Sequence, residues 1–103
     1  YSKMKNFFKE IKNKIIPVLK HYDISQAAIF GSYAHNNYKK DSDIDILIKF
    51  ERGKEKSLLK LVRLKFEIEH LLRKKVDLVT ISALSPYIKD DVLKSMKVIY
   101  EKQ

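Results

Sequence analysis

Three aspartates are the residues of this 103-residue chain whose type and spacing could do chemistry most directly. Asp43 and Asp45 alternate with isoleucine, so a strand here would point both carboxylates to one face, one pleat apart. Two carboxylates at that spacing repel each other unless a cation lies between them. We therefore expect this pair to bind a divalent metal ion.

A third carboxylate, Asp77, lies inside another apolar segment, where an unpaired charge would be costly to bury. We expect it to complete the same site, with Asp43, Asp45 and Asp77 as metal-binding and catalytic residues. The chain has no cysteine, which leaves oxygen and imidazole ligands and favours a hard cation such as Mg²⁺. Such ions bridge triphosphate oxygens and lower the pKa of an attacking hydroxyl, so the chemistry indicated is phosphoryl transfer.

Gly31 and Ser32 follow a short apolar run and could form the phosphate-binding part of the same site. Glycine allows a close approach of the backbone, and Ser32 could cap a short helix whose first amides hydrogen-bond phosphate oxygens. Each feature also has a plain structural interpretation. The aspartates could be surface or salt-bridged residues and the Gly-Ser pair only a turn.

The hydrophobic pattern predicts the elements that would position these residues. Helical spacing runs from Met4 to Tyr22, where Pro17 should kink or break the helix, and again over 58–72. Ser85 and Pro86 are typical of the start of a third helix that runs to about residue 96. Strands are expected at 26–30, 43–50, 76–81 and 98–100. We therefore expect one α+β domain over residues 1–103, a mixed sheet of about four strands with helices packed on it.

Composition narrows the class of partner. Lysine and arginine outnumber aspartate and glutamate by 22 to 13, and the resulting charge of +9 favours a nucleotide, a nucleic acid or an acidic protein surface. Many of these lysines could equally lie on solvated helix surfaces and bind no partner. The sequence shows no apolar run long enough for a membrane span and no signal peptide, so we expect a cytoplasmic protein without a membrane partner.

The order and spacing of these motifs resemble a known superfamily, the nucleotidyltransferases that include DNA polymerase beta. Its signature is Gly-Ser, ten residues, then Asp-x-Asp, which Gly31-Ser32 and Asp43-Ile44-Asp45 match without a gap. More narrowly, the chain is similar to the minimal nucleotidyltransferases known as MntA-type antitoxins, whose third carboxylate lies in a Val-Asp-Leu-Val strand like residues 76–79. The resemblance covers nearly the whole chain.

This resemblance implies a polymerase-beta-like fold and transfer of AMP from ATP, with two Mg²⁺ ions, to a hydroxyl group. In known relatives the acceptor is a tyrosine of a partner HEPN-domain toxin, which is silenced, so a hetero-oligomer with the toxin is expected. By the same analogy Asp43 and Asp45 would hold both metal ions, and Asp77 would share one and accept the hydroxyl proton. Ser32 would contact the triphosphate, and Gly31 would give the nucleotide room.

The chain departs from the family pattern directly after the Gly-Ser pair. Relatives often continue with Ala-Arg-Gly at the positions of Ala34, His35 and Asn36, so a titratable group replaces a permanent cation. We include His35 and Ser42 among the candidate nucleotide-binding residues, and Asn36 can still adopt the left-handed conformation of glycine. Tyr33 and Tyr38 flank this loop. Either ring could stack on a base or simply pack against the domain. His21 and His70 show no metal-ligand spacing and are interpreted as structural or surface residues.

Two other functions compete with the enzyme. The small size and His35 are compatible with an antitoxin of weak or no activity that neutralises its toxin by binding alone. The charge of +9 and the distant kinship with a polymerase favour a protein that binds or modifies nucleic acid. Against the latter, we find no helix-turn-helix or RNA-recognition motif.

Overall fold

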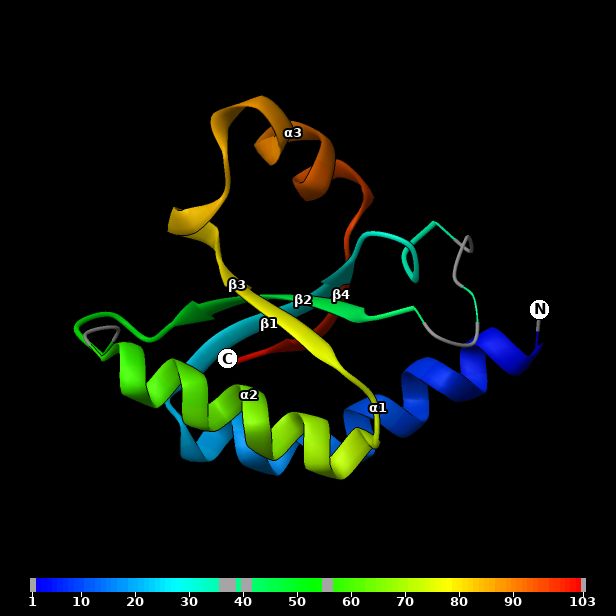
Figure 1. The fold of residues 1–103 in the computed structure, drawn as a ribbon, viewed down its shortest axis with the longest axis horizontal. Helices are drawn as coiled ribbons and strands as arrows, with labels where there is room; N and C mark the ends of the chain where they lie inside the picture. The colour runs from blue at the N-terminus through cyan, green and yellow to red at the C-terminus, as the bar shows by residue number, and fades with distance from the viewer. Residues whose placement is uncertain (1, 36–38, 40–41, 55–56, 103) are drawn as a thin grey trace.

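The computed structural model describes residues 2–35, 39, 42–54 and 57–102. Three α-helices, four strands and a short 3₁₀-helix follow one another along this part of the chain (Figure 1). They are α1 (Ser2–His21), β1 (Ile24–Phe30), β2 (Ile44–Phe50), α2 (Leu58–Leu72), β3 (Val76–Thr80), the 3₁₀-helix η1 (Ile81–Ala83), α3 (Pro86–Ser95) and β4 (Lys97–Glu101).

The four strands form one sheet in the order β3-β2-β1-β4. β1 is antiparallel to both β2 and β4, whereas β2 and β3 are parallel. A parallel pair cannot be joined by a hairpin, and here α2 provides the crossover connection. The predicted α+β class and mixed sheet are confirmed.

Alternation along β2 assigns one face of the sheet to the core. Ile44, Ile46 and Ile48 are fully buried and belong to the main hydrophobic cluster, together with Ile15 of α1 and Leu64 of α2. Helices α1 and α2 cover this face, and α3 lies on the opposite side of the sheet (Figure 1). Asp45 therefore faces away from the two core helices.

The helix ends carry most of the expected signals. Ser57 accepts a hydrogen bond from the backbone of Lys60 at the start of α2, and Ser85 caps α3 with Pro86 as its first residue. Helix α1 continues through Pro17, so the break considered from the sequence does not occur there. None of these helices, over the described residues, combines the length and apolarity that crossing a bilayer requires.

The short helix predicted after Gly31 is wrong: residues 31–35 form a turn. The amides of Ala34 and His35 both donate to the carbonyl of Gly31, at 3.1 and 3.2 Å. Gly31 has a φ of +69°, and the two hydrogen bonds to its carbonyl close a single turn that no further helical bond continues within residues 31–35. The strand predicted from Asp43 begins one residue later, at Ile44, and β1 begins earlier than predicted, at Ile24.

We predict that Ile46→Ala lowers the free energy of unfolding by roughly 2–5 kcal/mol, because it leaves a cavity in the packed core face of β2. The matched control is Ile88→Ala on α3, where the isoleucine is 48% exposed and the cost should stay below about 1 kcal/mol. Urea denaturation followed by circular dichroism measures both. Equal losses would show that β2 does not anchor the core in this way.

Candidate active site

Asp45 and Asp77 are brought together by strand pairing. They are direct register partners in the parallel ladder between β2 and β3, so both side chains project from the same face of the sheet. Asp43 lies one residue before β2, and its charge acts on Asp45. Asp43 and Asp77 are exposed, whereas Asp45 is half-buried. The structure thus places the three predicted carboxylates near the end of the sheet at which β2 and β3 begin.

The Gly-Ser turn packs directly against this carboxylate group. A Cβ atom added to Gly31 would overlap the Asp45 Oδ2 oxygen, and the positive φ of Gly31 disfavours any other residue as well. The sequence predicted a close approach at Gly31 to a nucleotide. The structure shows that the Asp45 carboxylate itself makes a close approach, so the two motifs form one site.

The pKa of Asp45 is raised above its ordinary value. Partial burial is the largest cause, because it disfavours the charged form, and the negative charges of Asp77 and Asp43 add to it. No hydrogen bond or ion pair joins any of the three carboxylates to another residue that the structure describes. The site therefore concentrates negative charge that the described part of the protein does not neutralise.

The chemistry of this donor set fits a hard divalent cation, because carboxylate oxygens are the ligands that Mg²⁺ prefers. Within residues 2–35, 39, 42–54 and 57–102, however, no three acidic, histidine or cysteine side chains converge closely enough to enclose an ion. Mutual repulsion opposes such convergence. Asp43, Asp45 and Asp77 are thus adjacent but not arranged as a closed metal site, and their role as ligands stays a prediction.

Ser32 is half-buried in the turn beside Gly31 and makes no hydrogen bond to a described residue. Its hydroxyl and amide are therefore available to a ligand. The amides of Ala34 and His35 are not, because the Gly31 carbonyl accepts from both. Among the groups expected to bind phosphate at this turn, the Ser32 hydroxyl and amide are the ones that no described residue engages.

The remaining loop residues have different environments. His35 is exposed, whereas the Ser42 hydroxyl accepts a hydrogen bond from the Lys39 amide at 2.7 Å and helps to close the loop before β2. The assignment of His35 and Ser42 to nucleotide binding stays a prediction. Asn36 and Tyr38 lie outside the described residues.

Tyr33 packs in the core. Its ring is 1% exposed and stacks on Phe7, with 4.9 Å between ring centroids and 13° between the planes. It is therefore not available to stack on a nucleotide base, and the packing interpretation is confirmed. His21 and His70 are both exposed on their helices, as the sequence interpretation allowed.

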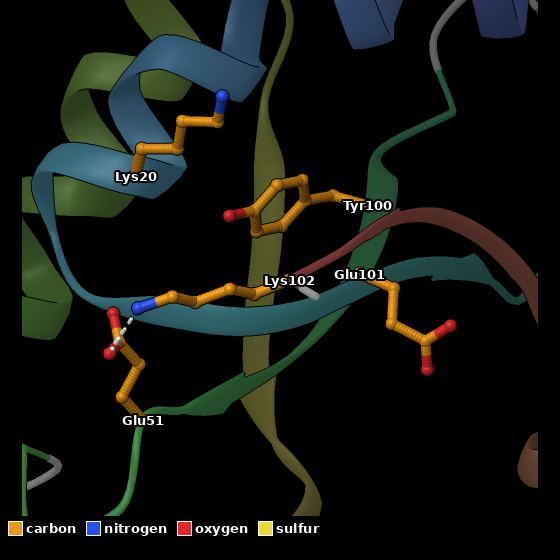
Figure 2. Close-up of a pocket in the computed structure, with 5 residues that line it drawn as sticks. All are labelled: Lys20, Glu51, Tyr100, Glu101 and Lys102. Carbon is orange, nitrogen blue, oxygen red and sulfur yellow. Dashed lines mark hydrogen bonds and ion pairs between the residues drawn. The ribbon is translucent and has the colours of Figure 1, made fainter.

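A hollow of about 470 Å³ lies beside the far end of β2, between the end of α1 and β4 (Figure 2). Two lysines, two glutamates and Tyr100 line it, and the ammonium of Lys102 pairs with Glu51 at 2.7 Å. Asp45 and Glu51 are six residues apart, about 20 Å along an extended chain. This hollow has balanced charges and does not include the carboxylate site.

A second hollow contains residues that the sequence did not single out. Lys49, Arg52 and Lys89 line it, and they come from β2, the turn after β2 and α3. The sequence contains one signal that relates this hollow to the carboxylates. Asp45, Leu47 and Lys49 alternate along β2, so their side chains share one face of the strand.

Known proteins resemble this chain in sequence and in fold. The family model described as "Polymerase beta, Nucleotidyltransferase" matches residues 13–103. A candidate protein adenylyltransferase of Methanocaldococcus jannaschii is 54% identical over 84 residues, which cover 82% of this chain and 88% of the relative. The protein adenylyltransferase MntA of Thermococcus cleftensis is 40% identical over 79 residues, covering 77% of this chain and 76% of MntA.

A solved structure supports the same likeness in three dimensions. The crystal structure of a toxin-antitoxin with AMP-PNP superimposes with a TM-score of 0.75 at 26% identity, covering 89% of this chain and 74% of that one.

We predict that Gly31→Ala destabilises the fold more than Gly53→Ala. Both glycines have a positive φ, which costs another residue about 1–2 kcal/mol, but a Cβ at Gly53 meets nothing within 4 Å. Overlap with Asp45 should add about 1–3 kcal/mol at Gly31. Urea denaturation measures the difference, which should shrink when Asp45→Ala is combined with Gly31→Ala. An excess unchanged by Asp45→Ala would refute the contact.

We predict a pH dependence of stability from Asp45, measured with a chelator present. Because its folded pKa lies above the ordinary 3.8, the folded state is destabilised as pH rises through that raised pKa. Asp45→Asn should therefore be more stable than the wild type at pH 7, with the difference fading below pH 4.

Asp23→Asn provides a control of opposite sign. The pKa of Asp23 is lowered, mainly by the hydrogen bond from Lys60, so this change should reduce stability at neutral pH. A wild type more stable than Asp45→Asn throughout the range from pH 4 to pH 7 would contradict the assignment of repulsion and burial to Asp45.

Proposed function

The chain belongs to the polymerase beta nucleotidyltransferase family, and on that premise we propose that it transfers AMP from ATP to a protein hydroxyl group. We propose further that it acts as the antitoxin of a HEPN-domain toxin and that a tyrosine of this toxin is the acceptor. The observation that carries the proposal is the parallel register of Asp45 and Asp77 beside the Gly31-Ser32 turn. The names of its relatives, protein adenylyltransferases, support the choice of reaction.

The reaction is a displacement at the α-phosphorus of ATP. The acceptor oxygen forms a bond to this phosphorus, the bond to the β-phosphate oxygen breaks, and diphosphate leaves with its electron pair. Ser32 donates hydrogen bonds to the triphosphate from groups that no described residue occupies. Asp77, exposed at the edge of the sheet, accepts the proton of the hydroxyl, in the role that the family resemblance gives it.

Asp43, Asp45 and Asp77 would hold magnesium, which neutralises charge on the triphosphate and the leaving diphosphate when it is bound. The raised pKa of Asp45 suits this role, because a group that repels its neighbours gains most from a nearby cation. His35 replaces an arginine of many relatives and contributes a weaker, titratable charge to the nucleotide. This substitution favours slow transfer.

The partner brings the acceptor to the site. Asp43 and Asp77 are exposed, so a hydroxyl on another protein can reach them without prior opening of this domain. The proposed transfer therefore takes place within a hetero-oligomer of this chain and the toxin.

We predict that ATP binds to the wild type only with magnesium and that Asp43→Asn/Asp45→Asn abolishes this binding, because two of the three ligands lose their charge. Isothermal titration calorimetry measures it. The matched control is Asp90→Asn/Asp91→Asn, which removes two exposed carboxylates from α3 and should bind as the wild type does.

The second step is transfer. With ATP labelled at the α-phosphate and a purified partner toxin, the toxin should become labelled and should lose the label when its acceptor tyrosine is changed. If the wild type does not label a toxin that it binds, the transfer proposal is wrong. Protection of cells by Asp43→Asn/Asp45→Asn would then favour an antitoxin that acts by contact alone.

A further inference from the structure

The second hollow, called here the basic hollow, lies at the far ends of β2 and β3, where η1 and α3 follow. It has a volume of about 680 Å³, within the usual range for ligand sites. Three cationic residues, Lys49, Arg52 and Lys89, contribute to its lining, and so do three hydroxyl residues, Ser25, Thr80 and Ser82. The Ser25 hydroxyl already donates to the Lys49 and Phe50 carbonyls, and the hydroxyls of Thr80 and Ser82 bond each other. Positive charge is therefore the main feature that the hollow offers to a ligand.

The described residues around the basic hollow do not neutralise its charge. Neither aspartate nor glutamate is among the lining residues that the structure describes. Lys49, Arg52 and Lys89 form no ion pair with a residue that the structure describes, and all three are exposed. Like charges held around one concave surface raise the local concentration of anions. The hollow is therefore suited to an anionic ligand.

The basic hollow and the carboxylate site share one face of the sheet. Asp45, Leu47 and Lys49 alternate along β2, so the side chain of Lys49 emerges on the same side as that of Asp45, about 13 Å further along the strand. Lys89 belongs to α3, which lies over this side of the sheet (Figure 1). Leu47, between Asp45 and Lys49, is 2% exposed, so an acceptor that spans both sites would pass over the residues that cover it.

The lining distinguishes an acidic peptide from a nucleic acid. Single-stranded nucleic acids are usually gripped by exposed aromatic rings on which bases stack. Among the lining residues that the structure describes, the one aromatic, Phe50, is only 9% exposed. Lysine and arginine pair with carboxylates as well as with phosphates, so the lack of an exposed ring in the described lining is what favours the side chains of an acidic peptide.

We propose that the basic hollow binds an acidic segment of the acceptor protein and thereby positions the acceptor hydroxyl for transfer at Asp43, Asp45 and Asp77. This inference rests on the proposed function, because it assumes a protein acceptor. It assigns to Lys49, Arg52 and Lys89 a part in acceptor recognition that is separate from nucleotide binding.

The test uses the whole chain and synthetic peptides. A fluorescent peptide with a central tyrosine flanked by three glutamates on each side is compared, by fluorescence anisotropy, with the same peptide carrying glutamines. The variant is Lys49→Gln/Lys89→Gln, and the control, Lys9→Gln/Lys12→Gln, removes the same charge from the exposed side of α1. Binding of the acidic peptide should weaken at least about fivefold in the variant and by less than about twofold in the control.

The outcomes separate this inference from the proposed function, because magnesium-dependent ATP binding is measured on the same proteins and should be unchanged in both variants. If the wild type binds ATP but prefers neither peptide, or if both variants weaken equally, the hollow does not recognise the acceptor and the transfer proposal stands. Loss of ATP binding in Lys49→Gln/Lys89→Gln would place the nucleotide in the hollow and overturn the inference. Tighter binding of a single-stranded RNA oligonucleotide than of the acidic peptide, lost in the same variant, would overturn it in favour of nucleic acid.

Discussion

The parallel pairing of β2 with β3 is the constraint on which the carboxylate site depends. Its register opposes Asp45 to Asp77 and Ile46 to Leu78, so the burial of Ile46 also determines where both carboxylates project. A slip of one residue would turn a carboxylate into the core and an aliphatic side chain into the site. The packing of the hydrophobic core therefore determines the geometry of the carboxylate site, although none of the three aspartates belongs to that core.

The Gly31 turn depends on the same pairing. Phe30, the last residue of β1, is the register partner of Asp45 in the antiparallel ladder with β2, so the chain leaves the sheet directly beside that carboxylate. Only a residue without a side chain fits between the turn and Asp45. Ser32 is consequently held next to the carboxylates by backbone geometry, and the two motifs, ten residues apart in the sequence, meet at one place.

Alternation predicted the strands and the two faces of β2 because a period of two distinguishes Asp45 from Ile44 and Ile46 without any knowledge of the fold. It could not predict which residue of β3 lies opposite Asp45, since register depends on tertiary packing. A short helix is predicted after Gly31 because a serine there suits a helix start as well as a turn. The sequence does not show that the helical hydrogen bonds end with the two that the Gly31 carbonyl accepts. The basic hollow was missed because Lys49, Arg52 and Lys89 come together only when η1 and α3 fold back over the ends of the strands.

The carboxylate site is not neutralised by any described residue, although the chain has a net charge of +9. A group of carboxylates in such a chain could have been neutralised by nearby lysines, which would lower the pKa of Asp45. No described cation pairs with these carboxylates; Lys60 pairs with Asp23 and Lys102 with Glu51, and the pKa of Asp45 is raised. An unneutralised, half-buried carboxylate reduces the stability of the folded protein. A site that served only the fold would be expected to lose this penalty, whereas the cation proposed for this site would remove it on binding. The unneutralised carboxylates are therefore explained by the proposed binding of a cation and not by folding.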